Sequence, residues 1–399
     1  MRRLFIFLFT FFSLYLSAQY NFEKLDQRMR QFVSDGELVG FQTLIIKGGK
    51  VIHTDLYGHD NLKEGKLLQQ NSIHRIASMT KCIVAVAIMK LYEKGYFELE
   101  DPIGLYIPEY KNPMVYQEDG TLKPASKPIR VIDVLRHTTG IGKTYPALRK
   151  EFDVLKFNPS FDLETEVKRM SEIPLAAEPG TLWIYGPSVS IGAYLIEKLT
   201  GQKIDVFLKK EIFDPLNMQD TFFEIPKEKH HRLASGYFLE RPGYHSLIDH
   251  PMSSPYTHNV TFYNPAGGLA STMLDFSIFC RMLLNKGTYK GTTILEPKTV
   301  ALMTSDQLKL IKNTKRSNDN HKPNNAIGFG FTFNVIKNIK AYPFPGSQGS
   351  YGWFGSWGPY FRIDPKEEMI MILMTQMKGW HYSRREIFEN HVYNAILNQ

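Results

Sequence analysis

The sequence predicts an α/β protein in which one antiparallel sheet is assembled from both ends of the chain, with a mostly helical region inserted between them. Alternating apolar and polar residues indicate strands at 41–57 and again beyond residue 329. Between them, residues 96–260 show helical spacing, proline-rich loops and little strand character. We therefore place the α/β part at about 19–80 and 260–399, and the helical part at about 81–259.

The N-terminal elements follow from hydrophobic spacing. Helical recurrence of apolar residues predicts a first helix that ends at Gly36: Phe22, Leu25, Met29, Phe32 and Val33. A hairpin is expected next, with strands at 41–47 and 51–57 and a Gly48-Gly49 turn. Residues 78–94 form a helix that is apolar nearly all round and ends at Gly95. A helix without a polar face is expected to lie in the centre of the protein.

The C-terminal elements complete the sheet. An amphipathic helix is predicted at 272–285, and strands are predicted at 329–335, 358–363 and 369–375. A final helix is expected from about Arg384 to Leu397.

Composition excludes some functions. The 399 residues are 43% apolar and 22% charged, which is an ordinary globular balance, and the formal net charge is +8. Lys and Arg are scattered among acidic residues and form no stripe, so nucleic-acid binding is not expected. The two cysteines, Cys82 and Cys280, lie in apolar runs. We expect free core thiols, and one disulfide between them is the alternative in an exported chain.

The first 18 residues are typical of a secretory signal peptide. Arg2-Arg3 precedes an apolar run from Leu4 to Leu16, which ends at the small residues Ser17-Ala18. The run is shorter than the roughly 20 residues that span a bilayer, so no stable membrane span is expected. We expect removal of residues 1–18 and a periplasmic or secreted mature protein of residues 19–399.

The central chemical signal is Ser78-Met79-Thr80-Lys81 at the start of the buried helix. Residues three apart share a helix face, so the Ser78 hydroxyl and the Lys81 amine should point the same way. A serine needs a base to become a nucleophile, and a desolvated lysine amine can serve. A capping serine followed by a surface lysine is the alternative. It fits poorly, because Lys81 leads into an apolar stretch where an idle charge would be costly.

The surroundings resemble the serine β-lactamase-related superfamily, which includes class C β-lactamases, D-alanyl-D-alanine peptidases and family VIII esterases. Residues 73–81, Ile-His-Arg-Ile-Ala-Ser-Met-Thr-Lys, are similar to its nucleophile segment. Further segments resemble the family in the same order along nearly the whole mature chain: 99–102, 106–109, 129–140, 179–185 and 267–272.

The resemblance implies a β-lactamase-like (DD-peptidase-like) fold and an acyl-enzyme mechanism. It makes Ser78 the nucleophile, and Lys81 and Tyr185 its catalytic partners. It also assigns an oxyanion hole to the backbone N–H groups of Ser78 and Ser356. No metal or organic cofactor is implied.

Two departures from the family pattern bear on the substrate. Pro187 replaces the Asn of the Tyr-x-Asn motif, and Trp353-Phe354-Gly355 replaces Lys-Thr-Gly. The chain therefore lacks a cation that would hold a substrate carboxylate. Ser188 and Ser190, which follow Pro187, resemble the family VIII esterases, and so does the Trp-x-Gly sequence at 353–355. Trp353, Phe354, Gly355 and Trp183 are candidate substrate-binding residues, although the aromatic side chains could equally be ordinary core.

We expect an exported esterase on small neutral esters. The alternatives are a D-amino-acid peptidase, amidase or β-lactamase on cell-wall-related substrates, and a non-catalytic protein that binds wall fragments. Tyr110-Lys111-Asn112 matches Tyr-x-Asn by letter but comes too soon after Ser78. His137 is interpreted as structural. Five loop histidines fit no zinc spacing: His230, His231, His245, His250 and His258.

Overall fold

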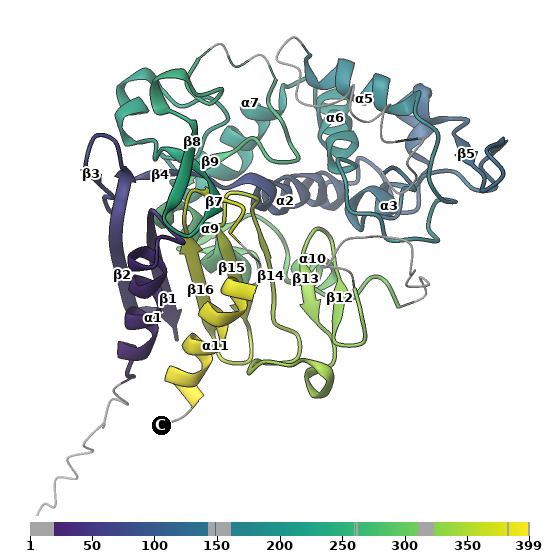
Figure 1. Cartoon of the computed structure of the whole chain (residues 1–399). Helices are drawn as coiled ribbons and strands as arrows, with labels where there is room; N and C mark the ends of the chain where they lie inside the picture. Colours follow the sequence, from purple (N-terminus) through teal and green to yellow (C-terminus); the bar gives the residue numbers. More distant parts are fainter. Residues whose placement is uncertain are drawn as a thin grey trace, which may run out of the picture.

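The sheet joins the two ends of the chain, as the sequence predicts (Figure 1). The computed structural model describes residues 20–142, 148, 161–258, 260, 262–309, 323–380 and 383–397, so the expected signal peptide at 1–18 lies outside the described residues. The eight strands are antiparallel in the order β12-β13-β14-β15-β16-β1-β2-β3. Their bounds are β1 Gly40–Lys47, β2 Lys50–Asn61, β3 Lys66–Leu67, β12 Ile327–Phe329, β13 Asn334–Ile336, β14 Tyr351–Phe354, β15 Tyr360–Asp364 and β16 Met369–Met374.

The junction between the two ends is the pairing of β1 with β16, which runs from Gln42 opposite Met374 to Lys47 opposite Met369. Alternate residues of β16 face opposite sides of the sheet, as strand geometry requires. Met369, Met371 and Leu373 belong to the core that includes α1 (Glu23–Ser34) and α11 (Ser383–Leu397). Ile370, Ile372 and Met374 belong to the larger core that includes α2 (Thr80–Glu93) and α9 (Met273–Leu284). Helices therefore cover both faces of the sheet, which is the predicted β-lactamase-like architecture.

The middle of the chain is mostly helical but carries more strand than expected. Its helices are α3 Val131–Leu135, α5 Leu163–Ser171, α6 Val189–Thr200, α7 Ile204–Leu208 and α8 Asp214–Leu216. A further helix, α10 Pro297–Met303, follows α9. The expectation of little strand character at 96–260 is wrong at two hairpins, β5–β6 and β7–β8. The short strands are β4 Ile73–Arg75, β5 Met114–Tyr116, β6 Leu122–Pro124, β7 Gly236–Arg241, β8 Tyr244–Asp249, β9 Ala270–Thr272, β10 Thr288–Tyr289, β11 Thr292–Thr293 and β17 Met377–Lys378.

The prediction of one strand at 329–335 is also wrong, because a turn divides this segment between the antiparallel strands β12 and β13. Gly330 donates to the Phe333 carbonyl, and Thr332 has a φ of 69°. The N–H groups of Phe331 and Thr332 bond to carbonyls outside the sheet. Buried phenylalanines at every second position imitate a strand in the sequence, although the backbone between them reverses direction.

The helix predicted at 78–94 is confirmed as α2, which begins two residues later after a 3₁₀ turn at Ala77–Met79. Every side chain from Thr80 to Met89 is buried, so this helix forms the centre of the protein. Close contact with α6 depends on Gly192, where an added Cβ would lie 2.4 Å from the Ile88 side chain. That contact brings the segment before α6 towards the start of α2.

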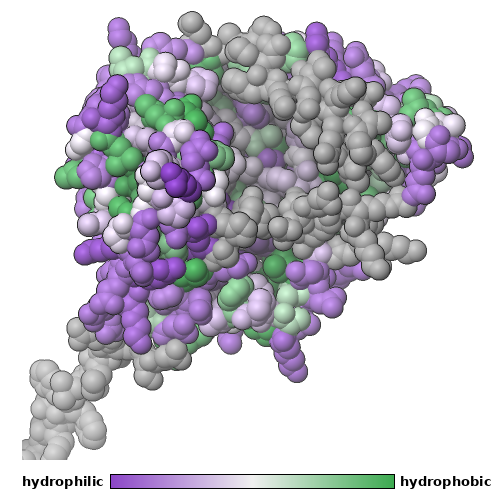
Figure 2. All heavy atoms as spheres, viewed as in Figure 1, coloured by the Kyte–Doolittle hydropathy of each residue, from purple (hydrophilic) through white to green (hydrophobic). Residues whose placement is uncertain are grey.

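The surface is largely hydrophilic on the face drawn in Figure 2, with hydrophobic residues gathered over the β7–β8 region. The exposed apolar side chains of that hairpin and the turn after it are Phe238, Tyr244, Leu247, Ile248 and Met252. Within the described part of the chain, no helix has the length and apolar character needed to cross a membrane.

Candidate active site

The structure brings Ser78 and Lys81 into contact at the start of α2. The Lys81 Nζ lies 3.2 Å from the Ser78 Oγ and donates to the Ala266 carbonyl at 2.5 Å. Ala77 has a φ of 46°, and the N–H of Ile76 bonds to the Leu269 carbonyl. The turn that presents Ser78 is therefore fixed against the strand that leads into β9. Ser78 stays half-buried while Lys81 is buried, so the hydroxyl remains accessible.

Burial changes the charge state of Lys81. Desolvation lowers the pKa of the Lys81 amine from 10.5 to about 7, and the nearby Cys82 and Glu166 oppose this only in part. An amine with this pKa is largely neutral in mildly alkaline solution. Lys81 can therefore accept the proton of Ser78, which an ordinary lysine cannot do at such a pH.

Tyr185 forms the next wall of the site. Its ring lies 4.9 Å from the Lys81 Nζ, and its phenol oxygen accepts a hydrogen bond from the Trp353 Nε1 at 3.1 Å. Two backbone bonds attach the preceding segment to the end of α3, from Ile184 N–H to the His137 carbonyl and from Gly180 N–H to the Thr138 carbonyl. Ser78, Lys81 and Tyr185, the catalytic residues predicted from the sequence, thus lie together.

The end of β14 packs directly on the nucleophile segment. A Cβ on Gly355 would lie 2.5 Å from the Ile76 carbonyl oxygen and 3.1 Å from the Ala77 side chain, so only glycine fits there. Arg385 donates to the Gly355 carbonyl at 2.8 Å and holds this end of the strand. Ser356, the exposed residue that follows, is therefore next to the Ala77–Ser78 peptide.

The candidate substrate-binding aromatics are mostly interior. Trp353 and Trp183 are 1% and 3% exposed. Both tryptophan rings contact the rings of Tyr185 and Phe329. Phe354 is half-buried and stacks on Trp353 with ring centroids 4.6 Å apart. This aromatic group packs around Tyr185, whose ring in turn covers the Lys81 amine.

A cavity of about 400 Å³ opens beside the same peptide. Gly267 contributes to its wall, and an added Cβ there would lie 3.6 Å from the Ala77 carbonyl carbon. Trp357, the neighbour of Ser356, lines it, but Trp183 and the 353–355 segment do not. Its remaining lining residues are Phe223, Ile248, Asp249, His250, Ser253, Pro255, Tyr256, Val260, Phe262, Asn264, Gly268 and Lys378.

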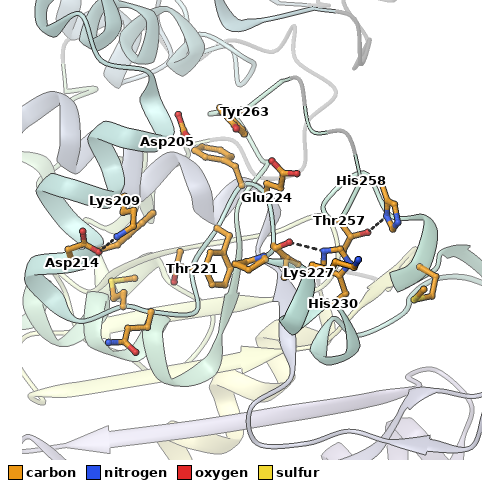
Figure 3. Close-up of a pocket in the computed structure, with 18 residues that line it drawn as sticks. Asp205, Lys209, Asp214, Thr221, Glu224, Lys227, His230, Thr257, His258 and Tyr263 are labelled. Atoms are coloured by element: carbon orange, nitrogen blue, oxygen red, sulfur yellow. Dashed lines mark hydrogen bonds and ion pairs between the residues drawn. The ribbon is translucent and has the colours of Figure 1, made fainter.

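A larger groove of about 1010 Å³ lies further from the chemistry (Figure 3). Its lining includes Asp205, Tyr263 and His258, and it shares Phe223 with the smaller cavity. Ser78, Lys81 and Tyr185 are among the lining residues of neither space. In Figure 3 the Thr257–His258 pair and the Lys209–Asp214 pair stand on opposite sides of this groove. We centre the candidate active site on the smaller cavity because Gly267 in its wall packs against Ala77, the neighbour of Ser78.

Other residues singled out in the sequence have structural surroundings. Tyr110 is buried and donates to the Val167 carbonyl at 2.9 Å. His137 is buried against Tyr185, bonds to the Ser188 hydroxyl at 2.9 Å, and has its pKa held well below the usual value by burial and by Lys81. Within the described ranges no three His, Cys, Asp or Glu residues group as metal ligands, and both cysteines are free and buried.

Sequence reasoning missed two residues. Glu166 is buried near Lys81, and burial raises its carboxyl pKa to about 7. Lys378 lines the cavity beside Ser78 although it belongs to none of the matched segments. No sequence signal distinguishes Lys378, because only the pairing of β17 with β7 brings it to the site.

Comparisons with known proteins find relatives along most of the chain. A beta-lactamase family model matches residues 25–392. Protein Rv1367c of Mycobacterium tuberculosis is 27% identical over 87% of this chain and 88% of its own length. Esterase EstB of Burkholderia gladioli is 27% identical over 50% of this chain and 51% of its own length.

A likeness to a solved structure extends the comparison to the fold. The structure titled EstCE1, a hydrolase with promiscuous acyltransferase activity, superposes with a TM-score of 0.77 at 20% identity, over 94% of this chain and 97% of that one. Because the family model covers most of the sequence and the same fold is seen, the chain belongs to the beta-lactamase family of serine hydrolases and related acyl-transfer enzymes.

Proposed function

We propose that this protein is an exported ester hydrolase that forms an acyl-enzyme on Ser78. The observation that carries the proposal is the buried Lys81 amine, 3.2 Å from the Ser78 hydroxyl and with its pKa lowered to about 7. A purely structural lysine would be expected to keep its charge and find a carboxylate partner. Here its hydrogen-bond partners are the Ser78 hydroxyl and a backbone carbonyl.

The reaction proceeds in two steps. Ser78 Oγ attacks the ester carbonyl carbon, and its proton passes to neutral Lys81, with the Tyr185 phenol beside both as a proton relay. The N–H groups of Ser78 and Ser356 stabilise the oxyanion. The proton then goes to the departing alkoxide, the C–O bond breaks and the alcohol leaves. Water attacks the acyl-enzyme in the same way and releases the acid.

The proposed ester preference rests on the lysine that the third motif lacks. The side chain at its first position is Trp353, which is buried and donates to Tyr185 instead of holding a substrate carboxylate. Pro187 offers no side-chain amide for a substrate amide. We propose small esters with no charge next to the scissile bond as substrates, acted on outside the cytoplasm.

Covalent labelling tests the nucleophile. A fluorophosphonate probe should add to the peptide that contains Ser78, and Ser78→Ala should abolish labelling. Ser126→Ala, at an exposed serine bonded to Glu178, is the matched control and should label normally. Labelling that survives Ser78→Ala would refute the assignment.

Substrate comparison tests the class. With one preparation, kcat/KM should be much higher for a short-chain nitrophenyl ester than for a chromogenic cephalosporin or a D-Ala-D-Ala peptide. A preference for either anionic substrate would replace the esterase with a β-lactamase or peptidase. Binding of wall fragments without turnover of any of the three would favour a non-catalytic protein.

A further inference from the structure

The cavity beside Ser78 has an apolar body. Four aromatic side chains contribute to its lining: Phe223, Tyr256, Phe262 and Trp357. Its walls include Gly267, which packs on the Ala77–Ser78 peptide, and Trp357, which follows Ser356. A substrate with its carbonyl at Ser78 would therefore extend an apolar group into this space.

The charged groups in the lining are Asp249, His250 and Lys378. Asp249 is already neutralised, because the fully buried Arg75 donates to it at 2.7 Å. The same guanidinium is further held by Ala234, Gln376 and Ser254. Arg75 and Asp249 together therefore give the cavity no net charge.

The ring of His250 is also occupied. Its Nδ1 accepts from the Met252 N–H, which leaves the Nε2 to face Glu64 at 3.4 Å. Lys378, by contrast, has no ion-pair partner among the described residues, and its Nζ rests 4.1 Å above the Trp357 ring. Lys378 is therefore the uncompensated cation of this cavity.

The position of Lys378 favours an anion. Burial is the main cause that lowers the pKa of the Lys378 amine, and Arg75 adds to it while Asp249 opposes it. A half-buried ammonium group has lost part of its hydration, and a bound carboxylate replaces the missing water contacts with charge-assisted hydrogen bonds. The Trp357 ring supports the ammonium group from one side only.

We propose that the cavity takes the apolar part of the substrate and that Lys378 binds a carboxylate that this part carries. This inference deepens the proposed ester hydrolase and rests on it. Lys378 belongs to β17, whereas the missing third-motif lysine would belong to β14, so the two cations would stand on different strands. The proposed carboxylate is therefore not the one that the third-motif lysine would hold. The substrate class is thus an ester that is uncharged around its carbonyl and carries a carboxylate beyond an apolar spacer.

Ligand binding tests the anion site without turnover. Thermal stabilisation of the protein would be titrated with 4-phenylbutanoate and with its uncharged analogue 4-phenylbutanamide. The carboxylate should half-saturate at about tenfold lower concentration, as expected for one charge-assisted hydrogen bond. Lys378→Met should remove this preference, and Lys378→Arg should restore most of it. Lys298→Met, at an exposed lysine that pairs with Glu296, should leave the preference unchanged.

Kinetics then test the link to catalysis. Nitrophenyl half-esters of dicarboxylic acids with four to ten carbons would be compared with their methyl-capped diesters. The free carboxylate should raise kcat/KM for at least one chain length, and Lys378→Met should abolish that gain. A preference that survives Lys378→Met, or equal binding of carboxylate and amide, would overturn the inference. Carboxylate binding through Lys378 without ester turnover would refute the proposed hydrolase and leave the anion site standing.

Discussion

Lys81 provides the sharpest test, because its proposed role depends on a charge state that can be titrated. With a pKa of about 7, the amine is about 90% neutral at pH 8, whereas a lysine at the usual 10.5 would be about 0.3% neutral. Burial therefore enriches the reactive base form roughly 300-fold at this pH. Only the neutral amine accepts a proton, so kcat/KM should rise about tenfold per pH unit below pH 7 and level off above it.

Lys81→Arg replaces the base with a permanently charged side chain near Ala266 and Tyr185. A guanidinium stays protonated in proteins, so ester hydrolysis should fall by about 10³-fold or more. The assay is kcat/KM for a nitrophenyl ester between pH 5.5 and 9, with the folding of each variant checked by its melting temperature. Lys90→Arg, on the same helix, is the matched control and should retain activity. An Lys81→Arg enzyme within tenfold of wild type, or a flat profile through pH 7, would refute the reasoning.

Three further predictions follow from particular contacts. Glu166→Gln removes a carboxylate that raises the pKa of Lys81, so the midpoint of the kcat/KM profile should move to lower pH. Gly355→Ala introduces a Cβ into a space closed by backbone, which displaces the Ser356 N–H, and kcat should fall by about 10²-fold in steady-state assays. Glu389→Ala leaves the buried Arg362 unpaired, and denaturant unfolding should show a loss of about 3–5 kcal/mol.

Two of these predictions have a control variant, and the Glu166 prediction has a direction of shift that can contradict it. A Glu166→Gln profile that shifts to higher pH, or does not shift, would contradict the coupling to Lys81. Gly346→Ala, where nearby atoms lie at least 3.5 Å from the added Cβ, should keep kcat. Lys209→Ala breaks an exposed ion pair with Asp214 and should cost less than about 1 kcal/mol. Equal losses from Glu389→Ala and Lys209→Ala would contradict the importance of burial.

Much of the fold follows from the sequence because apolar spacing records which face of each element is buried. The hairpin at 41–57, the all-apolar helix after Ser78 and the alternation in β16 each specify their own structure. The same spacing fails at Phe329–Phe333, where every second side chain is buried but the backbone turns. The spacing of apolar residues predicts which side chains are buried, but it does not predict the hydrogen-bond partner of each backbone N–H.

The site divides in the same way. Ser78 and Lys81 could be paired from sequence because one helical turn separates them, and Tyr185 could be added only through the family pattern. The approach of Tyr185 to Lys81 depends on α2 packing against α6. The pKa of Lys81 is likewise a property of the assembled core, since desolvation requires the side chains around it.

Tertiary structure alone decided the shape and charge of the substrate cavity. Ala266, Trp357 and Lys378 come from distant parts of the chain, and no spacing links them to Ser78. Their convergence results from sheet pairing and loop contacts, whose long-range register a linear pattern cannot encode. The sequence by itself therefore sufficed to pair the proposed nucleophile with its proposed base, because these residues are local. The structure determined what surrounds the reacting carbonyl, because that depends on how remote segments meet.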